Sequence, residues 1–161
     1  MTGNESDFIK LMGNPLRLKY FLFRKLPSAY FSGVRVKKLD SEYTEVTVPY
    51  KWFSQNPFRS TYFACLSMAA EMSTGLLVMM CIYKKKPGVS MLVLNVTGDF
   101  KKKATGITTF RCDDGDKIRK AVEEAIQTGE GRTIVAISRG TSEQNELIAE
   151  FSITWSFKAR K

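Results

Sequence analysis

The hydrophobic and polar positions of the chain predict one long apolar helix surrounded by strands. Residues 62–83 contain a single charged residue, Glu71, and are apolar on every side, which is typical of a helix buried all round by its own protein. Six segments alternate between apolar and polar residues or are rich in β-branched residues, and they predict strands: 34–37, 43–49, 90–100, 105–112, 132–139 and 147–157. The last of these alternates most regularly, so one face of it should be buried.

Three shorter helices are also predicted. One ends at Gly13, a second starts at Pro15 and runs to about Leu26, and a third is amphipathic and ends at Gly129. The lysines at 101–103, between the third and fourth strands, predict the tip of a hairpin.

These elements predict an α+β fold in which an antiparallel sheet of about six strands wraps the long helix. We expect a helical segment over residues 1–27 ahead of the main domain over residues 28–161.

Two segments have an alternative interpretation at a membrane. Residues 62–83 are long enough to span a bilayer, but a charged residue at its centre costs roughly 2.5–3.5 kcal/mol, so we expect no transmembrane segment. Residues 15–26 mix basic and aromatic side chains and suit a membrane surface. Packing against the open side of the sheet is favoured instead, because Leu18, Leu22 and Leu26 widen its apolar surface.

Composition excludes several kinds of chemistry. The 161 residues include no histidine, which rules out Ser-His-Asp and Cys-His sites and histidine-ligated zinc. Cys65, Cys81 and Cys112 are far apart and odd in number, so neither a disulfide framework nor a thiolate metal site is expected. The acidic residues near the N-terminus do not suit a secretory signal, and we expect a cytoplasmic protein with no metal and no cofactor.

The segment from Asn56 to Glu71, NPFRSTYFACLSMAAE, carries a family resemblance. It resembles the loop and helix of hotdog-fold acyl-CoA thioesterases of the phenylacetate-pathway type, and it is most similar to an uncharacterised branch of unknown function. In those enzymes a loop Asn precedes the helical acid by fifteen positions, the spacing found here. The resemblance implies a hotdog fold and a homodimer or dimer of dimers with sites at the subunit interface. It also implies an acyl-CoA-like ligand.

The same resemblance assigns candidate roles. Glu71 would be the base or nucleophile, Asn56 would orient water or the carbonyl, and backbone N–H groups near Tyr62 and Phe63 would hold the oxyanion. The relatives usually carry His-Gly-Gly where this chain has Tyr62, Phe63 and Ala64. Four further residues are candidates for binding substrate: Arg59, Ser60, Ser67 and Gly75. Arg59, and secondarily Lys101 to Lys103, would meet the phosphates of coenzyme A.

Each role has a purely structural alternative. Glu71 can be a buried acid satisfied by a neighbouring donor, and Asn56 can form a turn before Pro57. The net charge of +9 is compatible with nucleic acid, an anionic membrane or a phosphate-bearing ligand. No nucleic-acid-binding motif accompanies the charge, so no nucleic-acid partner is expected. Two functions follow: acyl-CoA thioester hydrolysis, or non-catalytic binding of acyl-CoA or fatty acid.

Overall fold

A computed structural model describes residues 3–160 and confirms the predicted α+β fold. Its helical elements are α1 (Gly3–Met12), α2 (Pro15–Lys25), α3 (Pro27–Ser32), the short 3-10 helix η1 (Trp52–Ser54), α4 (Phe63–Ile82) and α5 (Gly115–Thr128). Its strands are β1 (Arg35–Leu39), β2 (Thr44–Val48), β3 (Val89–Phe100), β4 (Thr108–Cys112), β5 (Arg132–Thr141) and β6 (Leu147–Ala159). They form one antiparallel sheet in the order β1-β2-β4-β5-β6-β3.

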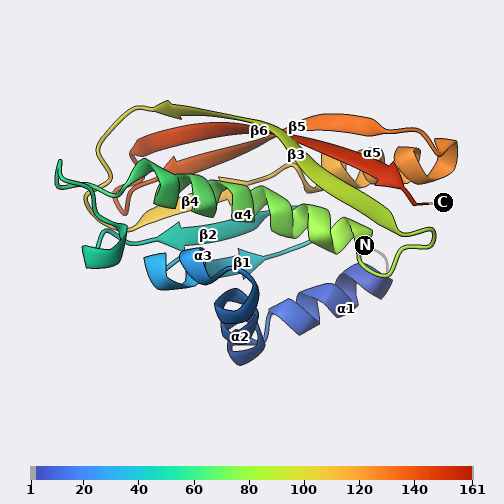
Figure 1. The fold of residues 1–161 in the computed structure, drawn as a ribbon, viewed down its shortest axis with the longest axis horizontal. Helices are drawn as coiled ribbons and strands as arrows, with labels where there is room; N and C mark the ends of the chain where they lie inside the picture. The colour runs from blue at the N-terminus through green and yellow to red at the C-terminus, as the bar shows by residue number, and fades with distance from the viewer. Residues whose placement is uncertain (1–2, 161) are drawn as a thin grey trace.

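Helix α4 is the core of the molecule, and the sheet curves around it (Figure 1). Two polar contacts pin it to the sheet: the Trp155 indole N–H donates to Thr74 Oγ1 at 3.0 Å, and the buried hydroxyls of Ser73 and Ser138 lie 2.7 Å apart. Among residues 3–160, α4 is the one helix long and apolar enough to cross a membrane. However, 72% of its most apolar 18-residue stretch is buried inside the protein. α4 is therefore a core helix of this protein.

The predicted hairpin with its tip at Lys101 to Lys103 is wrong. β3 pairs with β6 over its whole length, from Val89 opposite Ala159 to Phe100 opposite Ala149, and it does not contact β4 as a neighbour. The two longest strands of the sheet are thus matched with each other. After β3 the chain instead runs to β4, which lies between β2 and β5 in the sheet. β3 is therefore left as an edge strand.

The N-terminal helices pack on the side of the molecule where α4 lies beside β1 (Figure 1). Asn14 caps the start of α2, and its side-chain oxygen accepts from the N–H groups of Leu16 and Arg17, both at 3.1 Å. The broad apolar contact predicted for this helix is made only in part, because Leu22 is buried whereas Leu26 is exposed. Short helix α3 is not predicted by the sequence pattern.

The first helix is held by an ion pair to the helix that covers the sheet. Glu5 of α1 is fully buried, and its carboxylate lies 2.9 Å from Nε of Arg119 on α5. Arg119 also donates to the Ser41 carbonyl at 2.8 Å. This contact fixes α1 against α5.

Candidate functional site

Glu71 lies on the most open stripe of α4. Ala64, Ser67, Met68 and Glu71 are half-buried, whereas most of the helix is buried. Within the described residues no donor reaches the Glu71 carboxylate, and burial raises the pKa of this carboxyl above its ordinary value. A carboxylate shifted in this direction is closer to the pKa that suits a general base near neutral pH.

The carboxylate faces a small apolar cavity between α2 and α4. The cavity holds about 200 Å³ and has Glu71 as its acidic group. Its lining combines residues of α2 and its C-terminal cap, of α4 and of β3: Leu18, Phe21, Leu22, Lys25, Leu26, Met72, Gly75, Leu76, Met79 and Met91. Sequence reasoning missed the α2 wall and Met91, because contacts between distant segments leave no periodic signal in the chain.

Gly75 keeps the space beside the carboxylate free. A Cβ at this position would lie 3.1 Å from Glu71 Oε1 and 3.4 Å from the nearest atom of the Trp155 ring. Trp155 is itself fixed by its hydrogen bond to Thr74, one residue earlier on the helix. The predicted site residues Glu71 and Gly75 are therefore brought together, with a rigid indole behind them.

Both polar atoms of the Asn56 side chain form hydrogen bonds within their own loop. Its side-chain oxygen accepts from the N–H of Phe58 at 2.9 Å and from the N–H of Ser60 at 3.3 Å. Its amide nitrogen donates to Ser60 Oγ at 3.1 Å and to the Thr61 carbonyl at 3.4 Å. The side chain thus closes the loop before α4, as the structural alternative for an Asn-Pro sequence describes. Ser67 likewise donates to a helix carbonyl, that of Phe63.

The start of α4 presents two N–H groups with no acceptor among the described residues. The N–H of Tyr62 donates to the Ser54 carbonyl at 2.7 Å, so it is unavailable to a ligand. The N–H groups of Phe63 and Ala64 remain, at the positive end of the helix dipole. The position able to stabilise an oxyanion is therefore one residue later than Tyr62.

An open groove of about 590 Å³ borders this helix start. Phe58, Tyr62, Phe63 and Phe100 form its apolar part, and Lys101, Lys102 and Lys103 supply cations. Arg59, the stronger cation candidate from sequence, lines a different hollow beside Trp52. The helix start thus shares its groove with the lysines and not with Arg59.

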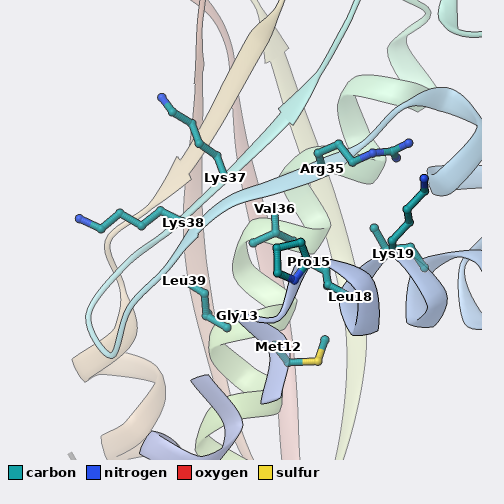
Figure 2. A pocket seen from close by; sticks show the side chains of 11 residues that line it. Met12, Gly13, Pro15, Leu18, Lys19, Arg35, Val36, Lys37, Lys38 and Leu39 are labelled. Carbon is teal, nitrogen blue, oxygen red and sulfur yellow. The ribbon is translucent and has the colours of Figure 1, made fainter. Parts of the chain in front are cut away.

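A further groove, of about 420 Å³, lies between α2 and β1 (Figure 2). Pro15, Leu18, Val36 and Leu39 gather in it, while Lys37 and Lys38 extend away from these apolar side chains (Figure 2). The two lysines are engaged elsewhere, Lys37 with Glu45 at 3.4 Å and Lys38 over the ring of Tyr43. No acid is among the residues that line this groove, so it lacks a carboxylate of the kind that Glu71 supplies.

Cys81 and Cys112 do not offer a substitute nucleophile. All three thiols are free and buried, and desolvation by burial raises the pKa of Cys81 and Cys112 to about 12. Thiols in this state are not nucleophilic at neutral pH. No group of three or more acidic or cysteine side chains within residues 3–160 is arranged to hold a metal ion.

One chain does not bring its carboxylate to its own oxyanion donors. Glu71 follows Phe63 by eight residues, which places it about 12 Å further along the helix axis. A reacting carbonyl must lie about 3 Å from its oxyanion donors, and the base must reach the attacking water at the same carbon. Within one copy, Glu71 and the helix start therefore cannot act on the same carbonyl group.

Comparisons with known proteins agree with this fold. A family profile described as a domain of unknown function, DUF4442, matches residues 17–157. A search of curated proteins found no match.

Among solved structures, a protein from Pseudomonas aeruginosa described as of unknown function and a probable thioesterase is 23% identical. It has a TM-score of 0.77, with 91% of this chain and 97% of that chain covered.

Two further solved structures are similar. A protein of unknown function from Chlorobaculum tepidum is 15% identical, with a TM-score of 0.75 and coverage of 91% of this chain and 94% of that chain. A thioesterase from Haemophilus influenzae is 14% identical, with a TM-score of 0.66 and coverage of 91% of both chains. At these identities the likeness shows a shared fold, which agrees with the predicted hotdog fold.

Proposed function

Because the chain belongs to the DUF4442 family, whose description assigns no activity, we propose its function from the site: hydrolysis of an acyl-CoA-like thioester. The observation that carries the proposal is the Glu71 carboxylate, which has no donor among the described residues and faces an apolar cavity beside Gly75. The thioesterase-like fold supports the same reaction class.

The reaction assigns one role to each group. Glu71 takes a proton from water, and the resulting hydroxide attacks the thioester carbonyl carbon. The N–H groups of Phe63 and Ala64 stabilise the negative oxygen that forms. The carbon–sulfur bond then breaks, and the thiolate takes the proton back from Glu71. The products are a carboxylic acid and a thiol.

The two hollows support one position for the substrate. The cavity between α2 and α4 accepts the acyl chain, because all but two of its lining residues, Glu71 and Lys25, are apolar or glycine. The groove at the helix start accepts the phosphate-bearing part, since Lys101, Lys102 and Lys103 line it.

The active unit is a homodimer that pairs two copies along β3. This edge strand of 12 residues has no neighbour on its outer side among the described residues, and its exposed side chains include Leu92, Leu94 and Val96. A long apolar edge of this kind is a template for pairing with another strand. Charging it with Leu94→Lys and Val96→Lys should give a monomer in light scattering and abolish turnover.

An antiparallel arrangement of the two α4 helices completes the site. Ser67 lies midway in sequence between Phe63 and Glu71, four residues from each. With Ser67 opposite Ser67 of the second copy, each carboxylate lies beside the other copy's helix start. A Ser67→Cys variant should then be joined to its partner by a short bismaleimide crosslinker. The wild type should not be crosslinked, because its own thiols are buried.

The decisive experiment uses a panel of acyl-CoA thioesters of different chain length. Wild-type protein should release thiol, and Glu71→Gln should lower kcat by at least 100-fold while leaving the dimer intact. Mixed dimers of Glu71→Gln with a variant blocked at the helix start, Ala64→Pro, should recover part of the activity, since one intact site then forms. Turnover that survives Glu71→Gln would refute the mechanism.

One observation favours a second function, the binding of an acyl thioester without hydrolysis. Phe63 and Ala64 each carry a Cβ next to the N–H groups that the carbonyl must approach, where glycine would leave room. Binding of acyl-CoA in calorimetry with no thiol release from any thioester of the panel would establish this function instead. We place either activity in the reducing cytoplasm, which suits three free thiols.

A further inference from the structure

Charge is distributed very unevenly along the chain. Between Asp7 and Asp40 there is no acidic residue, while eight Lys or Arg side chains occur there. This segment contains α2, α3 and β1. Three exposed cations of α2, Arg17, Lys19 and Arg24, form no ion pair with any residue in the described part of the chain. A region so free of acids attracts anions over a distance.

The same region exposes a continuous run of aromatic rings. The ring of Phe23 lies 5.3 Å from Tyr30, Tyr30 lies 5.3 Å from Phe31, and Phe31 lies 5.8 Å from Phe53. Trp52 extends the run, with its centroid 6.0 Å from that of Phe53. These rings join α2, α3 and η1 into one surface, which we call the aromatic-basic face.

Helix α2 extends the aromatic-basic face with one apolar stripe. Leu16, Tyr20 and Phe23 recur at helical spacing and are 79%, 66% and 50% exposed. Trp52 is 81% exposed. Segments that lie in a lipid headgroup layer combine exposed apolar and aromatic side chains with neighbouring cations, as this surface does.

We propose that the aromatic-basic face docks on an anionic phospholipid bilayer. Arg17, Lys19 and Arg24 contact lipid phosphates, and Trp52, Phe53 and Tyr20 enter the interface between headgroups and acyl chains. Charge complementarity selects this occupant, since the face carries cations and no acidic residue, and its Tyr and Trp rings are the amphipathic side chains that suit a lipid headgroup layer. An α2 seated on lipid would also bring one wall of the Glu71 cavity to the membrane.

The docking proposal is independent of the proposed hydrolysis, because it is tested without substrate. The full chain is centrifuged with vesicles of phosphatidylglycerol and phosphatidylcholine, and with vesicles of phosphatidylcholine alone. We expect binding to the first only, weakened by salt. The triple variant Arg17→Gln, Lys19→Gln, Arg24→Gln should bind roughly 100-fold more weakly, at about five-fold per cation.

A matched control removes the same charge elsewhere. Lys86→Gln, Lys120→Gln and Arg160→Gln change three exposed cations outside the aromatic-basic face, and this variant should bind within about three-fold of wild type. Equal weakening in both variants would overturn the proposal, since net charge alone would then explain binding. Binding to DNA or to an acidic protein without binding to vesicles would overturn it as well.

Trp52 reports the depth of docking directly. The other tryptophan, Trp155, is buried, so lipid brominated on its acyl chains should quench Trp52 selectively. The Trp52→Phe variant should show no quenching while keeping its fold by circular dichroism. Unquenched wild-type fluorescence on anionic vesicles would show that the rings stay in water, and would overturn insertion.

Discussion

Substituting Gly75 by alanine tests whether the space beside Glu71 is functional. Alanine in a helix interior is about 1 kcal/mol more favourable than glycine. The new Cβ would meet the Trp155 ring at 3.4 and 3.5 Å, which is ordinary contact, and Glu71 Oε1 at 3.1 Å, which is tight. The carboxylate is the end of a flexible side chain, so it can move by a few tenths of an ångström.

We therefore expect Gly75→Ala to raise stability and lower activity at the same time. The gain should be about 0.5–1 kcal/mol, or roughly 1–4 °C in Tm for a chain of this length. The displaced and further desolvated carboxylate should reduce kcat by about three- to ten-fold and move the pH-rate profile to higher pH.

Urea unfolding followed by circular dichroism measures the first effect, and thiol release at saturating acyl-CoA measures the second. Gly3→Ala is the control, because its Cβ meets nothing within 4 Å and it lies on α1. A loss of more than 1 kcal/mol would mean that Glu71 and Trp155 cannot move apart. An unchanged kcat would mean that the space beside the carboxylate is not used.

Three other predictions concern stability. Burial raises the pKa of Glu71, so its contribution to stability is fully present below about pH 4 and is lost as the pH rises through the folded pKa. The free energy of unfolding of Glu71→Gln in urea should therefore equal that of wild type at pH 4 and exceed it at pH 8. A difference that does not change with pH would contradict this. Arg119→Leu removes a cation that faces buried Glu5 and donates to the Ser41 carbonyl, and it should cost about 3 kcal/mol in urea unfolding, against a negligible change for exposed Lys120→Leu. Gly115→Ala would place a Cβ 2.6 Å from the carbonyl oxygens of Ser41 and Glu42 and should cost about 2 kcal/mol, whereas a neutral result in thermal melts would show that this turn can shift.

Local patterns in the sequence are sufficient to predict the elements of the core. The unbroken apolar stretch gives α4, and alternation along residues 147–157 gives β6 with Phe151, Ile153 and Trp155 inward. The pattern does not specify which strands pair, because partner choice depends on contacts between distant segments. The wrong hairpin after β3 follows from this limit. Six-residue α3 is missed because it is shorter than two helical turns.

The same limit applies to the candidate site: residues marked by local sequence are predictable, and those that depend on tertiary contacts are not. Glu71 stands out because an acid in an apolar helix is unusual, and Gly75 follows from helical spacing. The occupied N–H of Tyr62 depends on a carbonyl eight residues earlier, at Ser54, which only the folded loop brings near. The α2 wall of the cavity and the exposed rings of η1 depend on tertiary packing in the same way.

Oligomeric state and proton affinity are coupled in this arrangement. In one copy, no donor reaches the Glu71 carboxylate among residues 3–160, and the N–H groups of Phe63 and Ala64 have no acceptor there. The antiparallel pairing of two α4 helices would place the positive end of one helix beside the carboxylate of the other, which favours the ionised acid. Dimerisation should therefore lower the raised pKa of Glu71 toward its ordinary value. Assembly would then both complete the site and tune the proton affinity of its catalytic base.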